Sequence, residues 1–244
     1  MRITRYLSGL LALALLAAAC DDDDNKDADP KRAEVGLQMR ATTTQSQIDA
    51  GRAQETGLIF TGVWLGVSEI ELETEDENIR EAQGQDDDDD IEFEGRYTVD
   101  LIQGTSSPDF GLADILPGVY EEIEFELNRI IGDTASILIT FEKPQDGADP
   151  LRVEYSSRDD FEIEIEDDNG LQMEEAGNNQ VLVLLDLDRL MDAVDLTAAT
   201  ADDDGIIRIN SNSNATIAAR IAANLRQAFD AGDDDDDDDD FDDD

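Results

Sequence analysis

The sequence predicts an all-β protein: an antiparallel, Greek-key-like β-sandwich of about ten short strands with one C-terminal α-helix at residues 214–230. Apolar and polar residues alternate with a period of two through most of the chain after residue 33. Gly, Pro, Asn and Asp separate the alternating segments. The 244 residues are 40% hydrophobic, which suits one domain with a sizeable core.

Residues 1–19 predict a lipoprotein signal peptide. Arg2 and Arg5 precede a short apolar run that ends in small residues. The run has about half of the roughly 20 residues that a transmembrane helix needs. The chain's single cysteine, Cys20, follows directly, and Ala17-Ala18-Ala19-Cys20 resembles the lipobox of bacterial lipoproteins, in which the thiol is lipidated. We therefore expect lipidation at Cys20. The alternative is an ordinary signal peptide that contains a cysteine.

Residues 20–33 predict an acidic, solvated tether between the membrane and the domain. Acidic residues after a lipidated cysteine resemble inner-membrane retention signals in some bacteria and surface-export signals in others. The sequence thus places the protein in the bacterial cell envelope and favours the outer membrane. Which side of the membrane it faces stays open.

Segments in which apolar and polar residues alternate follow one another between residues 35 and 209. Between Val67 and Ile70 the alternation changes phase, which predicts a β-bulge. The only tryptophan, Trp64, lies inside an alternating segment, which favours a packing role. The predicted strands are 35–39, 63–67, 70–72, 91–101, 119–127, 137–141, 151–155, 161–165, 181–187 and 206–209.

A helix is predicted near the C-terminus, where apolar residues recur every four positions at Ile217, Ile221, Leu225 and Phe229. Ser213 or Asn214 is the expected cap, and Gly232 is expected just past the end. A shorter helical turn is expected at 189–194 with Asp188 as its cap. The sandwich domain then covers 34–231, and residues 232–244 are a disordered poly-Asp tail.

The charge of the chain excludes several functions. It has 17 Lys and Arg against 63 Asp and Glu, a net charge of −46, and no histidine. The acidity repels phosphate backbones and excludes nucleic acid as a partner. The absence of histidine excludes Ser-His-Asp triads and imidazole metal ligands. Abundant Asp with few Lys is typical of proteins in concentrated salt, where the Debye length falls from about 8 Å to about 3 Å at 1 M.

One motif recurs along the chain: EIELE at 69–73, IEFE at 91–94, EIEFE at 122–126 and EIEIE at 162–166. In each segment a strand would carry apolar side chains on one face and glutamates on the other. If these strands were neighbours, each pair of facing glutamates would cost about 0.2–1 kcal/mol. Separate sheets, salt or bridging cations could relieve that repulsion.

Calcium is the candidate bridging cation, because it accepts six to eight oxygen ligands. A solvated acidic face without a ligand is the favoured alternative, since exposed carboxylates are common. Apart from Ca²⁺, no cofactor is predicted. The candidate ligands are Glu92, Glu94, Glu122, Glu124, Glu126, Glu162, Glu164 and Glu166.

Two other acidic segments carry no site. Aligning Asp202–Gly205 with a calcium-binding loop leaves Thr200 first and Ser211 twelfth, so both ends of the ligand set fail. The loop is expected to be an acidic turn before a strand, and Asp86–Asp90 a hairpin tip. Because the chain has 63 Asp and Glu residues, finding two carboxylates that could form a catalytic pair is not evidence of an active site. We predict no enzymatic activity and no catalytic residue.

A family resemblance covers most of residues 34–230. The segments VWLGVSEIELETE, LPGVYEEIEFEL, VLVLLDLDRL and ADDDGIIRIN resemble uncharacterised bacterial lipoproteins whose β-sandwich domain has no assigned function. The resemblance implies fold and location but transfers no functional residue.

Two functions follow as hypotheses. The first is a lipid-anchored interaction module for a surface protein, glycan or mineral, with Ca²⁺ as a candidate cofactor. The second is a structural envelope protein without a specific ligand, whose acidity serves solvation in high salt.

Overall fold

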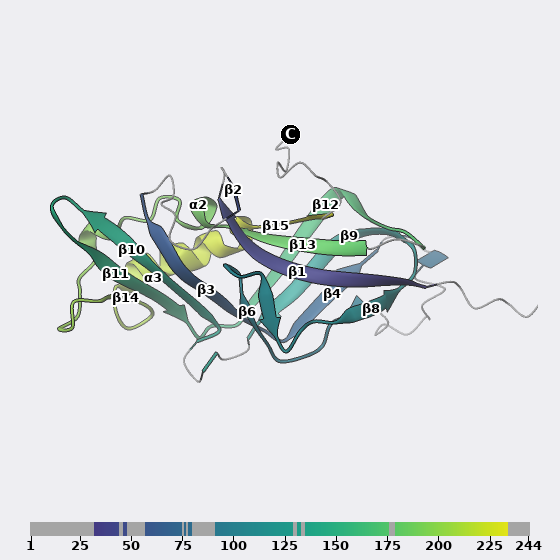
Figure 1. Ribbon diagram of the computed structural model, residues 1–244, viewed down its shortest axis with the longest axis horizontal. Coiled ribbons are helices and arrows are strands. Elements are labelled where there is room, and N and C mark those ends of the chain that lie inside the picture. The colour runs from purple at the N-terminus through teal and green to yellow at the C-terminus, as the bar shows by residue number, and fades with distance from the viewer. Residues whose placement is uncertain are drawn as a thin grey trace, which may run out of the picture.

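A computed structural model describes residues 32–43, 46–47, 57–74, 76, 78–79, 91–128, 131–132, 135–175 and 179–233. The predicted all-β sandwich is confirmed, because the strands of this part of the chain form three sheets around one hydrophobic core (Figure 1). The predicted signal peptide, Cys20, nearly all of the tether, Asp86–Asp90 and residues 234–244 lie outside the described residues.

The first sheet is built on β1 (Ala33–Thr43), which pairs in parallel with β13 (Asn179–Asp186). The predicted antiparallel arrangement is therefore wrong for this pair, because the two strands are distant in the sequence and no hairpin sets their direction. The antiparallel strand β15 (Phe229–Asp233) extends the sheet beyond β13. On the other side of β1 lie β2 (Ser46–Gln47) and β8 (Leu112–Ile115). Six consecutive residues of β13 are buried, which is typical of a strand covered on both faces.

The second sheet has the order β14-β11-β10-β3-β6-β7. Its one parallel pair joins β11 to β14, whereas its other neighbours are antiparallel. The strands are β3 (Ile59–Val67), β6 (Tyr97–Asp100), β7 (Thr105–Ser107), β10 (Ile137–Gln145), β11 (Ala148–Ser157) and β14 (Ile207–Ile209).

The third sheet has the order β12-β9-β4-β5 and is antiparallel throughout. Its strands are β4 (Glu69–Glu73), β5 (Ile91–Glu92), β9 (Gly118–Leu127) and β12 (Phe161–Met173). All four strands that carry the recurrent Glu motif therefore belong to one sheet.

The chain passes from the second sheet to the third at Ser68, between β3 and β4. The Ser68 amide donates to the Glu126 carbonyl at 3.1 Å, and the Ser68 carbonyl accepts from the Gly95 amide at 2.9 Å. The expected bulge between Val67 and Ile70 is therefore wrong. The change of phase marks a strand that leaves one sheet and enters another.

The predicted C-terminal helix ends earlier than expected. The helix α3 covers Ala215–Asn224, a 3-10 turn η2 covers Leu225–Ala228, and β15 begins at Phe229. Phe229 pairs with Leu185 of β13, so its four-residue spacing from Leu225 reflects a buried strand position. The predicted start of the tail at 232 is also wrong, since β15 continues to Asp233.

The two expected helix caps differ as well. Asn214 precedes α3 in a left-handed conformation with φ 52° and makes no side-chain capping bond. Its amide nitrogen instead donates to the carbonyls of Thr200 (3.0 Å) and Arg208 (2.7 Å). The shorter helix, α2 (Leu187–Leu190), is capped by Asp186 and not by Asp188. A second 3-10 turn, η1 (Leu196–Ala198), follows.

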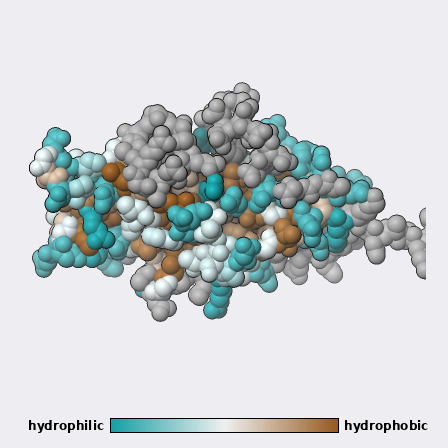
Figure 2. Space-filling model, viewed as in Figure 1, coloured by the Kyte–Doolittle hydropathy of each residue, from teal (hydrophilic) through white to brown (hydrophobic). Residues whose placement is uncertain are grey.

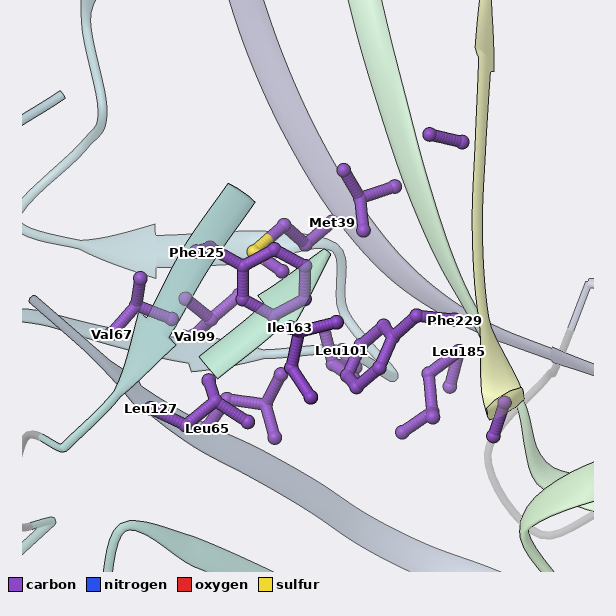
Figure 3. Close-up of a cluster of buried hydrophobic side chains, with 14 of the residues drawn as sticks. Met39, Leu65, Val67, Val99, Leu101, Phe125, Leu127, Ile163, Leu185 and Phe229 are labelled. Atoms are coloured by element: carbon purple, nitrogen blue, oxygen red, sulfur yellow. The ribbon is translucent and has the colours of Figure 1, made fainter. Parts of the chain in front are cut away.

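The core lies where the three sheets meet (Figure 3). Phe125 of β9 packs edge-on against Phe229 of β15, with ring centroids 4.9 Å apart. Leu65 of β3 and Met39 of β1 belong to the same cluster. One core therefore unites strands that are distant in the sequence.

On the face seen in Figure 2, hydrophilic and hydrophobic side chains alternate over the described surface. Leu112 of β8 is the one large apolar side chain among the described residues that is strongly exposed, at 66%. No helix in the described ranges has the length and apolar character needed to cross a bilayer.

Candidate functional site

The candidate site is one face of the third sheet, where glutamates alternate with buried apolar residues on three adjacent strands. In β9, for example, Ile123 and Phe125 are buried and the intervening glutamates point to the other side. We call this surface the glutamate face. It consists of Glu69, Glu71 and Glu73 of β4, Glu122, Glu124 and Glu126 of β9, and Glu162, Glu164 and Glu166 of β12.

The strand register places these glutamates directly opposite one another. Glu124 pairs with Glu164 on one side and Glu71 on the other. Glu126 lies between Glu162 and Glu69 in the same way, and Glu122 between Glu166 and Glu73. The six opposed pairs form three rows, so β9 carries the repulsion of both neighbouring strands. Of the reliefs considered from the sequence, dispersal of the motif over separate sheets is thereby excluded.

Three of these side chains come closest together. Glu73, Glu122 and Glu124 each offer a carboxylate oxygen, and the three oxygens lie within 4.8 Å of one another. Ca²⁺ has Ca–O distances of about 2.3–2.6 Å, so oxygens on opposite sides of one ion lie about 5 Å apart. The donor set is purely carboxylate, which suits the hard cations Ca²⁺ and Mg²⁺. These residues therefore fit a divalent cation.

The electrostatics of the face show the cost of this arrangement. Partial burial raises the pKa of Glu122, and the charges of Glu73, Glu164, Glu124 and Glu166 raise it further. The pKa of Glu124 is raised by the same two causes, with Glu162 as its strongest charged neighbour. Every charge that shifts these two pKa values is another glutamate. A bound cation would therefore remove a real electrostatic cost.

Glu126, at the end of the face, is held by neutral donors. The Ser68 hydroxyl donates to its Oε2 at 3.1 Å, and the Asn128 amide donates to the same oxygen. Neutral hydrogen-bond donors therefore hold the carboxylate at the end of the face that lies near the strand crossing.

The structure brings together six of the eight predicted ligands: Glu122, Glu124, Glu126, Glu162, Glu164 and Glu166. Glu92 lies on β5 opposite Glu71, at the edge of the sheet. Glu94 does not join the face, because it follows the end of β5 and is exposed. The predicted set also omitted Glu69, Glu71 and Glu73. Their motif, EIELE, is the same as that of the other strands and could have identified them.

Replacing Glu124 by Gln is expected to stabilise the protein at neutral pH and low salt by about 0.4–2 kcal/mol. Two opposed like-charge pairs disappear, at about 0.2–1 kcal/mol each. The pKa of Glu124 in the folded protein lies above its ordinary value of 4.5, so the folded state takes up protons first as the pH falls. Wild-type stability should therefore rise from neutral pH toward 4.5, and this rise should be smaller in the variant. Urea unfolding over a pH series measures both effects.

Glu94→Gln is the matched control, because this exposed glutamate lies outside the glutamate face. It should leave both the stability and its pH dependence within about 0.5 kcal/mol of wild type. Equal effects of the two substitutions would show that the opposed pairs carry no specific repulsion.

The loop at Asp202–Gly205 is the acidic turn that the sequence predicts. Arg208 of β14 donates to Asp202 and Asp204, each at 2.8 Å. The hydrogen bonds from this guanidinium lower the pKa of Asp204 to about 2. The Arg208 guanidinium thus pairs with two carboxylates of this loop.

Residues 58–229 match the family described as Domain of unknown function (DUF4382). No curated protein matches the sequence. Among solved structures, the chain is similar to "MbnP from Methylosinus trichosporium", with a TM-score of 0.41 and 9% sequence identity. The similarity covers 72% of this chain and 83% of MbnP, and it is too distant to support an argument about function.

Proposed function

The chain belongs to the DUF4382 family, and we propose that it is a lipid-anchored, non-catalytic interaction module of the cell envelope whose glutamate face engages its partner through divalent cations. The observation that carries this proposal is the register of β12, β9 and β4, which opposes nine glutamates in three rows. A bridging cation would relieve the repulsion between these glutamates and would also be a ligand of this face.

The anchor is supported by the sequence. The sequence predicts a signal peptide over residues 1–19, directly before the sole cysteine, and an acidic tether over residues 20–33. The negative charge of the tether and the domain is repelled by anionic lipids, which keeps the glutamate face accessible to a partner beyond the membrane. We propose the outer membrane as its location.

The non-catalytic assignment rests on the chemistry of the chain. It has no histidine, and its carboxylates on the glutamate face are opposed in identical pairs. A pair of carboxylates that acts as general acid and general base has environments that push the two pKa values apart. On the glutamate face, by contrast, the same causes raise the pKa values of Glu122 and Glu124 together. This arrangement suits cation binding better than catalysis.

Thermal unfolding with and without Ca²⁺ tests the proposal. At matched ionic strength, Ca²⁺ at about 100-fold over its Kd should add about 2.7 kcal/mol to the free energy of unfolding. Glu124→Gln should lose most of this gain, because it removes one of the three clustered carboxylates, whereas Glu94→Gln should keep it. The melting temperature in CaCl₂, compared with NaCl and with chelator, is the measurement.

An identical melting temperature in CaCl₂ and in NaCl of the same ionic strength would contradict the specific cation site. A gain that depends on ionic strength alone would support the second hypothesis, in which the acidity serves solvation in high salt.

A further inference from the structure

The strand β12 contains the chain's only Asn-Gly sequence, Asn169-Gly170. The pairing of β12 with β9 stops at Glu166 and resumes at Leu171. Residues 167–170 therefore have only one residue of β9 opposite them and form a bulge. Such a bulge lies outside the regular ladder of main-chain hydrogen bonds, so its amides are not held by the neighbouring strand.

The bulge requires a glycine after Asn169. Gly170 has a φ of 67°, a conformation that residues with a side chain rarely adopt. A Cβ atom at this position would also lie 2.3 Å from Cγ1 of Val119 on β9. The fold thus explains why a residue without a side chain follows this asparagine.

The side chain of Asn169 is exposed, and no residue in the described part of the chain makes a hydrogen bond to it. The main-chain amide of Asn169 donates to Oδ1 of Asp167 at 2.8 Å, which fixes the backbone of the bulge. The side-chain amide is left free to turn toward the next main-chain nitrogen, that of Gly170.

The other described asparagines differ from Asn169 in one of two ways. Nearly all of them are held by side-chain hydrogen bonds; Asn179, for example, donates to two main-chain carbonyls, at 3.0 and 3.1 Å. Asn212 is exposed, and its side chain likewise has no partner among the described residues, but a serine follows it. Asn212 is therefore a matched control within the same molecule.

An asparagine in this setting reacts with its own main chain. The amide nitrogen of Gly170 attacks Cγ of Asn169, the Cγ–Nδ2 bond breaks, and Nδ2 leaves as ammonia with the amide proton of Gly170. Water then opens the resulting five-membered succinimide ring. Cleavage of the bond to Cγ gives aspartate, whereas cleavage of the bond to the main-chain carbonyl carbon gives isoaspartate.

Two features of the site favour this reaction. It is intramolecular, so its rate depends on how readily the nitrogen and Cγ approach each other. Glycine presents the least obstructed main-chain nitrogen, because it has no side chain and the widest range of backbone conformations. Apart from water, no co-reactant is needed.

We propose that Asn169 is a modification site at which the folded protein deamidates itself, through attack by the Gly170 amide nitrogen, to aspartate and isoaspartate. The product carries one additional negative charge on β12, in the bulge that follows Glu166. The reaction does not depend on the cation binding proposed above.

Mass spectrometry of tryptic peptides tests this proposal. The full-length protein in detergent is incubated at neutral and at mildly alkaline pH, either folded or unfolded in urea, and is digested at intervals. Residues 159–189 form the peptide with Asn169, and residues 209–220 form the peptide with Asn212. Fragment ions show which residue has exchanged its side-chain NH₂ for OH, and methylation by protein-isoaspartate methyltransferase detects isoaspartate.

We expect Asn169 of the folded protein to be converted at least about tenfold faster than Asn212. The rate should rise with pH, because the attacking nitrogen must lose its proton. Asn169→Gln should keep the melting temperature of wild type and show no conversion at this position, since the longer side chain would have to close a larger ring.

Three results would overturn the proposal. Asn169 of the folded protein could stay unmodified, or it could react no faster than Asn212. Rapid conversion of Asn169 in urea but not in the folded protein would show that the bulge protects the asparagine instead of exposing it to attack. Circular dichroism and the melting temperature show that the incubated protein and the variant remain folded.

Discussion

Phe125→Ala is expected to lower the free energy of unfolding by about 3–5 kcal/mol, which is a large part of the 5–15 kcal/mol typical of a domain. Phe125 is 1% exposed and lies in register between Ile70 of β4 and Ile163 of β12. Its ring meets Phe229 of the first sheet edge-on (Figure 3). The substitution would leave a cavity between two sheets, where neither backbone can move inward without breaking its strand pairing.

Phe110→Ala is the matched control. Phe110 also contacts an aromatic ring, that of Tyr97 at 4.7 Å, but it is only partly buried. It should lose less than half as much stability as Phe125→Ala in urea unfolding. If Phe125→Ala does not accumulate as folded protein, Phe125→Leu provides a milder test, because it keeps most of the apolar volume. Equal losses for Phe125→Ala and Phe110→Ala would show that the contact between the sheets adds nothing.

The alternation that places Phe125 in the core was visible in the sequence, whereas its partners were not. Period-two patterning shows which side of a strand is buried but carries no information on which strands are neighbours. The parallel pairing of β1 with β13 joins residues 35 and 179, a relation that no local pattern encodes. The sheet order therefore had to come from the structure.

Phe229 shows how one spacing can belong to two structures. Four residues separate it from Leu225, which fits a helix, yet it is buried in β15 as the partner of Leu185. The pairing with β13 completes the first sheet and buries Phe229 against Phe125. A tertiary contact thus overrides a helical pattern that is only four turns long.

The sequence predicted that strands with one acidic face exist, but it did not predict all of the glutamates that form the site. Each EIEIE-like segment predicts a strand with one acidic face, and the structure confirms this for β4, β9 and β12. The central position of β9 decides which glutamates are opposed on both sides. That position makes Glu122 and Glu124 the electrostatic centre of the face and leaves Glu94 outside it.

Trp64 illustrates a residue whose role depends on its surroundings. Its place in an alternating strand favoured packing, and it does pack over Gly62. The structure adds that it does so on the face of the second sheet that is turned away from the core, where it is half-buried. Alternation in a sequence shows which residues share one face of a strand, but it does not show what lies against that face. The position of Trp64 could therefore not be predicted from the sequence.

Cys20→Ser is expected to move the protein almost completely from the membrane fraction to the soluble fraction. Each acyl CH₂ buried in a bilayer contributes about 0.8 kcal/mol, so the lipid on this cysteine would supply nearly all of the binding free energy. The acidic chain after Cys20 opposes binding, since an anionic bilayer repels it. Among the described residues, no helix is long and apolar enough to serve as a second anchor. High salt should not release the wild-type protein, because a lipid anchor is not electrostatic, whereas a protein held by bridging Ca²⁺ should be released by chelator.

Fractionation of cells expressing wild type, Cys20→Ser and the control Ser8→Ala, each washed with salt and with chelator, distinguishes these cases. Membrane retention of Cys20→Ser after both washes would contradict the anchor.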